Sequence, residues 1–451
     1  MSITDKYIEQ LSTNSLNIDL IDATFVRQDQ VIKGMGFIYQ NSNGEIFIKV
    51  FNQIKSKDSF ECLSEDLFNQ EKELGAILGA DKYYSFSGLT IKQQSLHCNR
   101  VRIEDSINFE VFIFKIHSDL IESNTSENYA DFHYVQTLIG ADLKIPTNGV
   151  ETVRKNHPDN TYSFKTKNNL WYFTSDDNIN FKFIKERNYI RLTIASSNIP
   201  VNKGFVLNCI HTLSFILGKN MNYKLISIFD KKGNIVNYYS WQKDKVYDNT
   251  VLHPPLVINY DKPAYHSQLF ELYLNYIQSG KGERLLHSQK AVASSSYSYL
   301  SVFSLTLATS IEKICNFYFH SSIKQKLDVK IDEEISIVKG SIISLNLSDS
   351  LRNRIKGFLG TIKKGIRTKD ILYDLEGQGL ISEGLAKGWS NLRDPLAHGN
   401  QRSGSIQERF DLVNSNLLLY YQLIFLVIRY KGKYSDYSKH GYPVEEFTTN
   451  S

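Results

Sequence analysis

The spacing of hydrophobic residues changes once along this chain, at a proline-rich stretch near its middle. Pro254, Pro255 and Pro263 lie close together, although the 451 residues include only 8 prolines. Before this stretch, apolar and aromatic residues tend to alternate with polar ones, as in half-buried strands. After it, apolar residues recur at helical spacing. The change predicts a junction between a β-rich domain and a helical domain.

Short β-branched and aromatic runs dominate the first half, which we predict to be a β-rich sandwich or barrel-like domain over residues 1–255. Asn43-Gly44 is typical of a hairpin turn, and a second hairpin is expected around residues 231–233. One helix is expected over residues 202–220, with Gly218 as its C-terminal cap. The expected strands are residues 22–30, 31–40, 45–51, 109–117, 169–175, 180–186, 189–196, 222–230 and 234–242.

The second half, residues 256–451, is predicted to be an all-α bundle, which makes the chain an α+β protein. Five helices are expected, and the last begins at a capping box formed by Ser405 and Glu408. Two helices carry apolar stripes that should face the core. The first stripe is Leu351, Ile355, Phe358, Leu359 and Ile362, and the second is Leu385, Trp389, Leu392 and Leu396.

Composition narrows the class of protein. A formal net charge of +4 is too small for a protein that coats nucleic acids non-specifically. A polyanionic ligand would therefore have to bind a local basic patch. The four cysteines, Cys62, Cys98, Cys209 and Cys315, lack disulfide or zinc-ligand spacing and indicate free thiols. The polar N-terminus is not typical of a signal peptide. The apolar runs at residues 291–311 and 417–428 are interpreted as buried helices, the second being too short to span a membrane, so a cytoplasmic protein without membrane contact is expected.

The stretch 391–399, NLRDPLAHG, combines residue types that can cleave RNA. Arg393 and His398 would lie about 140° apart on an ideal helix, so Pro395 would have to kink the helix to bring them together. An imidazole can move protons near neutral pH, and a guanidinium can stabilise a phosphorane-like transition state. The alternative is structural: Arg393 would pair with Asp394 or Glu383, and His398 would cap the helix end.

Together with the helical bundle, this motif resembles the HEPN superfamily, whose ribonuclease members carry an Arg, a polar residue and a His at the end of a helix. The matching residues are Arg393, Asp394 and His398. Many HEPN domains also place an acidic residue in an earlier apolar helix that faces the motif, which corresponds to Glu312 in LATSIEKICNFYF. The chain departs from the motif at Pro395, which the pattern does not require. A lone carboxylate at the rim of a core helix is the structural alternative for Glu312.

The order of the two halves is similar to that of ApeA-type antiphage proteins. This resemblance implies a metal-independent endoribonuclease toxin that cleaves tRNA or another cellular RNA in abortive infection. It implies catalytic roles for Arg393 and His398, supported by Asp394 and Glu312. It also implies a homodimer through the HEPN domain and a phage-derived trigger at the N-terminal domain. We expect no cofactor and no metal ion.

A basic run precedes the motif and could follow an RNA backbone. No acidic residue interrupts this run, although a solvated helix face is an equally good interpretation of any one member. The run consists of Arg352, Arg354, Lys356, Lys363, Lys364, Arg367 and Lys369.

Two other functional classes remain open from the sequence. The HEPN bundle could be a non-catalytic nucleotide- or protein-binding dimerisation module. The β-rich half could instead bind sugars or peptides, although aromatic residues in strands are more often core. The aromatic candidates for that role are Trp171, Tyr172, Tyr238, Tyr239 and Trp241, while His211, His253 and His266 are interpreted as structural.

Overall fold

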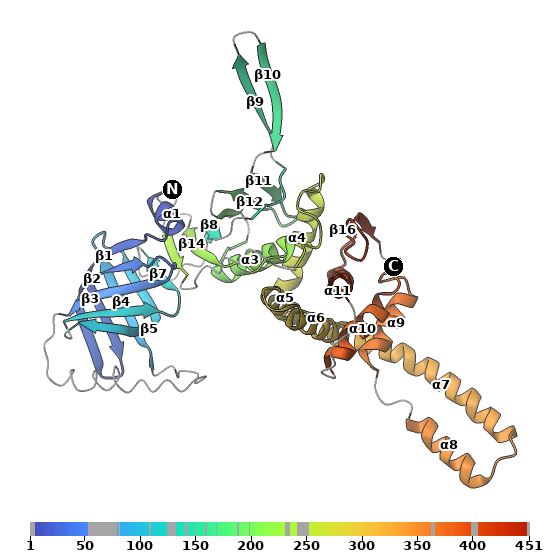
Figure 1. The fold of residues 1–451 in the computed structure, drawn as a ribbon. Helices are drawn as coiled ribbons and strands as arrows, with labels where there is room; N and C mark the ends of the chain where they lie inside the picture. Colours follow the sequence, from blue (N-terminus) through green and yellow to red (C-terminus); the bar gives the residue numbers. More distant parts are fainter. Residues whose placement is uncertain are drawn as a thin grey trace. The chain divides into compact units, whose positions relative to one another are not determined.

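The computed structural model divides into two compact units (Figure 1). The β unit comprises Met1–Ser214 and Met221–Tyr247, and the helical unit comprises Phe215–Asn220 and Asp248–Ser451. The structure describes residues 5–52, 79, 82–107, 110–123, 132–139, 143–148, 150–157, 160–167, 169–186, 189–197, 199–230, 235–240, 252–361, 366–397 and 405–448.

The β unit contains a closed six-stranded antiparallel barrel in the order β1-β2-β3-β6-β5-β4, and β4 pairs back with β1. The predicted Asn43-Gly44 hairpin is confirmed between β2 and β3, and Gly44 has a φ of +81° that favours glycine. The barrel strands are β1 (Asn17–Arg27), β2 (Gln30–Gln40), β3 (Ile46–Asn52), β4 (Tyr84–Thr90), β5 (Ser95–Ile107) and β6 (Val111–Ile116).

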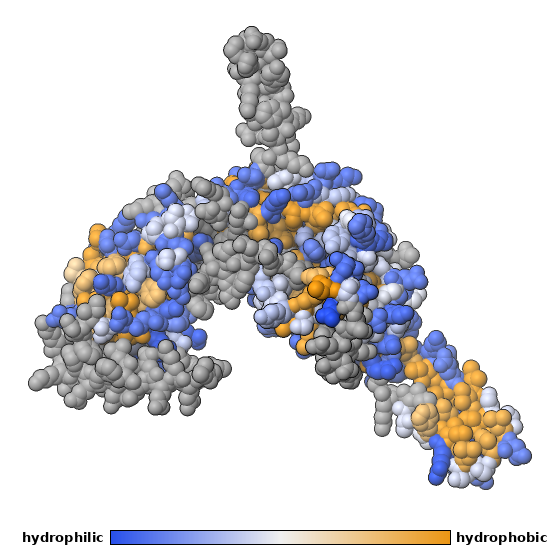
Figure 2. All heavy atoms as spheres, in the orientation of Figure 1, coloured by the Kyte–Doolittle hydropathy of each residue, from blue (hydrophilic) through white to orange (hydrophobic). Residues whose placement is uncertain are grey.

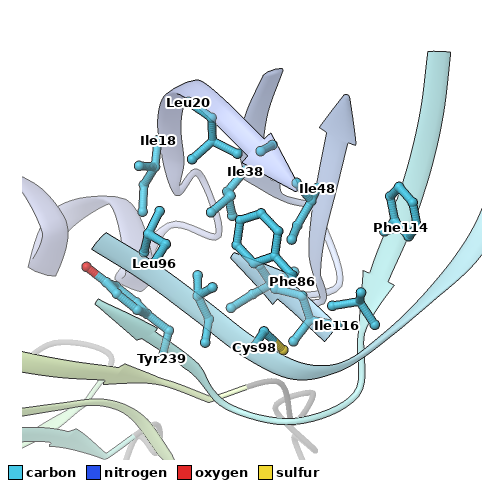
Figure 3. Packing of buried hydrophobic residues seen from close by; sticks show 14 of the residues in the cluster. Ile18, Leu20, Ile38, Ile48, Phe86, Leu96, Cys98, Phe114, Ile116 and Tyr239 are labelled. Carbon is cyan, nitrogen blue, oxygen red and sulfur yellow. The ribbon is translucent and has the colours of Figure 1, made fainter. Parts of the chain in front are cut away.

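Alternating side chains fill the barrel with apolar groups, which explains the alternation in the sequence (Figure 3). Phe25 and Phe114 stack with their ring centroids 3.8 Å apart, and the Phe86 ring lies 5.0 Å from Phe25. Both Phe25 and Phe86 are completely buried. Closure removes the free strand edges that an open sheet would present.

The sheet continues beyond the barrel because β5 also pairs with β7. The continuation follows the order β7-β15-β14-β8-β13-β12-β11, and the hairpin predicted around residues 231–233 joins β14 to β15, although its turn lies outside the described residues. These strands are β7 (Leu120–Ser123), β8 (Phe132–Ile139), β11 (Leu170–Thr174), β12 (Ile179–Lys185), β13 (Ile190–Ser196), β14 (Tyr223–Asp230) and β15 (Ile235–Tyr239); β9 (Val150–His157) and β10 (Asn160–Lys167) form a separate hairpin.

Two described helices accompany the strands: α1 (Asp5–Ser12) and α3 (Lys203–Leu217). Helix α3 confirms the predicted helix, and Gly218 follows it with a φ of +61°. A Cβ atom on Gly218 would lie 2.9 Å from the His253 carbonyl carbon, so only glycine fits both the backbone and the space. The last residues of α3 belong to the helical unit.

The helical unit has more elements than predicted. Its described part contains eight α-helices, the π-helical segment η2 and a terminal strand pair, so the expectations of five helices and an all-α domain are wrong. The chain turns at residues 296–299 and divides the apolar run 291–311 between two helices. The elements are α4 (Ala264–Gln278), α5 (Glu283–Ser295), α6 (Leu300–Ile314), η2 (Cys315–Phe319), α7 (His320–Ser344), α8 (Asp349–Thr361), α9 (Thr368–Gly377), α10 (Leu385–Ala397), α11 (Ile406–Ile428), β16 (Gly432–Ser435) and β17 (Val444–Phe447).

Helix α11 is the central apolar helix of this unit. The predicted capping box is confirmed, because the Ser405 hydroxyl accepts from the Glu408 N–H at 3.2 Å and the Glu408 carboxylate accepts from the Ser405 N–H at 2.7 Å. The apolar run 417–428 lies within a 23-residue helix that is long and apolar enough to cross a membrane. In the described part of the chain, one helix meets this criterion. Of its most apolar 18-residue stretch, 72% is buried inside the protein.

The α7–α8 hairpin corrects one predicted apolar stripe. Only Leu359 of the described stripe residues is buried, in a small cluster with Ile335 and Ile342, and Ile355 packs against the edge of this cluster. Leu351 and Phe358 are 46% and 67% exposed. A two-helix hairpin buries only its seam, so apolar residues beside the seam stay at the surface, where Figure 2 shows a hydrophobic area. Ile362 lies outside the described residues.

Candidate active site

Glu312 and Arg393 come together from helices α6 and α10. The Arg393 Nε atom lies 3.9 Å from a Glu312 carboxylate oxygen, and both side chains are about one-third exposed. The ion pair is therefore solvent-accessible and can be reached by a ligand.

The packing of α10 on α6 explains why these two residues meet. The Trp389 indole N–H donates to the Ala308 carbonyl at 3.1 Å, in the buried interface between the helices. Arg393 follows Trp389 by four residues, and Glu312 follows Ala308 by four residues, so each pair lies on one helix face. The two helices therefore advance in the same direction along this contact. Leu385, Trp389 and Leu392 are buried, which confirms the described part of the second predicted stripe.

A π-helical segment begins three residues after Glu312 in the chain. Segment η2 begins at Cys315, and the exposed Asn316 lies one turn beyond Glu312. The Thr368 hydroxyl at the start of α9 lies 3.5 Å from the Asn316 side-chain oxygen, at the limit of a hydrogen bond. π-Helical turns widen a helix locally and are frequent at functional sites. Sequence reasoning missed Asn316 and Thr368, because only the fold brings α9 next to this turn.

Burial controls the chemistry of the nearby thiol. Burial raises the pKa of the Cys315 thiol, and the Glu312 charge raises it further. Cys315 is therefore a neutral packing residue and not a nucleophile at neutral pH. Cys98 and Cys209 are also buried and free, as predicted, and Cys62 lies outside the described residues.

The rest of the predicted motif is only partly described. Helix α10 continues through Asp394 and Pro395 to Ala397, so the proline is accommodated within the helix. His398 lies outside the described residues. Whether Arg393 and His398 share a pocket stays a prediction.

The predicted basic run divides into different environments. Arg352 is partly buried: it pairs with Asp349 at 2.9 Å and donates to the Leu347 carbonyl at 3.3 Å, so it stabilises the α7–α8 turn. Arg367 pairs with Asp370 at 3.2 Å. Arg354, Lys356 and Lys369 are exposed, the last with its ammonium 5.7 Å from the Tyr373 ring centroid, and Lys363 and Lys364 lie outside the described residues.

The β unit offers weak support for the aromatic sugar- or peptide-binding hypothesis. Trp171 and Tyr239 are completely buried, and the Tyr239 hydroxyl donates to the Glu122 carboxylate at 2.6 Å. Tyr238 is covered by the Lys203 ammonium, 4.8 Å from its ring centroid. Tyr172 is 54% exposed, and Trp241 lies outside the described residues.

Within the described ranges, no three His, Cys, Asp or Glu side chains are grouped so that they could hold a metal ion. His266 is completely buried in α4, where burial lowers its pKa to about 4. The His253 ring stacks on Tyr437 with centroids 5.0 Å apart. The burial of His266 and the stacking of His253 both agree with the structural interpretation of these histidines.

No family model, curated protein or solved structure matches the chain.

Proposed function

We propose that this chain is a metal-independent endoribonuclease of the HEPN type. The observation that carries the proposal is the Glu312–Arg393 pair, since it joins the two parts of the motif across helices α6 and α10 at a solvent-accessible position. The guanidinium group of an Arg can donate to a phosphate and stabilise its negative charge.

The reaction needs only the RNA and protein side chains. The ribose 2′-oxygen forms a bond to the adjacent phosphorus while the bond from phosphorus to the 5′-oxygen breaks. A proton leaves the 2′-hydroxyl and another is delivered to the 5′-oxygen, which produces a 2′,3′-cyclic phosphate and a 5′-hydroxyl end. His398 serves as the proton-transfer group, and Arg393 stabilises the charge on the phosphorane.

The same proposal assigns the chain to antiphage abortive infection, with tRNA or another cellular RNA as substrate. The active form is a homodimer through the helical unit, and a second copy of His398 supplies the second proton-transfer group. The β unit acts as the sensor of a phage-derived trigger. Asp394 is a supporting polar group beside Arg393.

The test compares purified wild-type protein with His398→Ala and Arg393→Ala on total cellular RNA, and maps new ends for cyclic phosphate. Wild type should generate such ends, and each variant should reduce their rate by at least about 100-fold. Lys387→Ala is the matched control, because Lys387 is exposed on the same helix as Arg393. If wild type and His398→Ala generate cyclic-phosphate ends at the same rate, the catalytic role assigned to His398 is wrong. RNA binding without new ends would favour the non-catalytic HEPN module.

A further inference from the structure

A surface hollow of about 470 Å³ lies between α5 and the α6–η2 segment, next to the proposed active site in the chain. Its size is in the range of small-molecule sites. Lys313, directly after Glu312, and Asn316, one turn further, both belong to its wall. The lining residues are Arg284, His287, Ser288, Ala291, Lys313, Ile314, Asn316, Phe317 and Tyr318.

The hollow combines an aromatic and apolar wall with a cationic rim. Phe317 is 44% exposed, and the Arg284 guanidinium lies 3.8 Å from its ring centroid. Ile314 and Ser288 are buried at the base. None of the lining residues in the described part of the chain is acidic, although Glu283 lies beside the rim and contacts His287 at 3.7 Å.

One hydrogen bond and one close backbone approach position this wall. The Tyr318 hydroxyl donates to the Lys281 carbonyl at 3.2 Å, which ties η2 to the start of α5. A Cβ atom on Gly282 would lie 2.3 Å from the Ile277 Cα, so only glycine allows α5 to begin this close to α4. The π-helical turn places consecutive Asn316, Phe317 and Tyr318 on the same hollow.

We propose that the hollow binds one unstacked nucleotide of single-stranded RNA, next to the phosphate that is cleaved. This inference rests on the proposed ribonuclease function and adds a subsite to it. The base stacks against the Arg284–Phe317 pair, since single-stranded RNA is recognised by stacking on aromatic rings and guanidinium planes. Lys313 and Arg284 meet the nucleotide's phosphate, and Asn316 can bond the base or the ribose.

The test measures binding of a 5′-fluorescein-labelled, fully 2′-O-methylated RNA hexamer of mixed sequence to the full-length protein by fluorescence anisotropy. This probe lacks free 2′-hydroxyls along its length, so its binding does not depend on cleavage. Phe317→Ala and Arg284→Gln should each weaken binding about tenfold, and Phe317→Trp should restore it. The controls are Tyr299→Ala, an 86% exposed aromatic residue at the other end of α6, and Lys330→Gln, an exposed charge on α7; both should bind within twofold of wild type.

Three results would overturn the subsite: no binding by wild type, equal binding by Phe317→Ala, or a loss confined to the charge variants without an effect at Phe317. Loss at Phe317 with rescue by Trp supports it even if wild type cleaves no RNA. In that case the proposed catalysis fails while the nucleotide site stands. Melting temperatures of all variants show that each remains folded.

Discussion

Glu312 and Arg393 form an ion pair whose value to stability should be small. Both side chains are about one-third exposed, and exposed pairs contribute roughly 0–1 kcal/mol. A pair of this kind is poorly explained by stability alone. The ion pair lies one helical turn beyond the buried Trp389–Ala308 hydrogen bond, and this position orients the Arg393 side chain.

Replacing Glu312 by Gln should therefore separate activity from stability. We expect the free energy of unfolding to fall by less than about 1 kcal/mol, and the rate of RNA cleavage to fall about tenfold or more, because Arg393 loses the carboxylate that orients it. Urea denaturation and single-turnover cleavage measure the two effects. Asp374→Asn, which breaks the 2.9 Å pair with Lys326, is the control and should leave cleavage unchanged. Loss of folding and activity together would assign Glu312 a structural role.

Buried His266 should make the helical unit sensitive to acid. Burial lowers its pKa to about 4, so the folded protein keeps the ring neutral while the unfolded chain takes up a proton below about pH 6.5. The unfolded state binds more protons between these values, so stability should fall as pH decreases from 6.5 to 4, by a few kcal/mol at most. His266→Gln cannot titrate, and its stability should lack this part of the pH dependence. Parallel pH profiles of wild type and variant would refute the explanation.

At the scale of elements, the contact between α6 and α10 decides the candidate site. The buried indole hydrogen bond and the apolar face of α10 hold the two helices in register. Helix α10 also contacts α11, because the Asn416 side chain donates to the Gly388 carbonyl at 3.3 Å. Arg393 is thus carried by a helix that is held on two sides.

Replacing Trp389 by Phe should weaken the packing of α10 on α6. The variant keeps most of the apolar area but leaves the Ala308 carbonyl without the indole N–H, so we expect the free energy of unfolding to fall by about 1–2 kcal/mol. Urea denaturation followed by circular dichroism measures the change. Lys387→Ala, at an exposed position on the same helix, should stay within about 0.5 kcal/mol of wild type. A Trp389→Phe protein as stable as wild type would mean that the hydrogen bond does not hold the helices.

At the scale of the whole molecule, the proline-rich segment is fastened to the helical unit. The Val257 N–H donates to the Ser435 hydroxyl at 2.9 Å, and the Tyr421 and Tyr437 hydroxyls donate to the carbonyls of His253 and Pro254. The end of α3 also belongs to this unit, where Phe215 stacks on Tyr273 with centroids 4.3 Å apart. The assignment of residues 1–255 and 256–451 to separate functional domains stays a prediction.

Phe215→Ala should therefore destabilise the helical unit, although Phe215 precedes the proline-rich segment. Phe215 is 3% exposed, and removing a buried ring of this size costs about 3–5 kcal/mol. Thermal unfolding of the full chain, with hydrogen exchange to locate the change, should report weaker protection in α4 and α11. The exposed Tyr299→Ala variant is the control. Unchanged protection in these helices would show that Phe215 does not support them.

The amino-acid sequence by itself determined the strand-like first half, the helical second half, the Gly44 hairpin, the Gly218 cap and the Ser405–Glu408 capping box. These features depend on periodicity and backbone preference within a few residues. The tertiary structure alone decided the closure of the barrel, the exposure of Leu351 and Phe358, and the hydrogen bond from the Trp389 indole to the Ala308 carbonyl that sets α10 against α6. Such outcomes depend on packing between segments such as α6 and α10, whose Ala308 and Trp389 are 81 residues apart, and local patterns carry no information about which faces will meet.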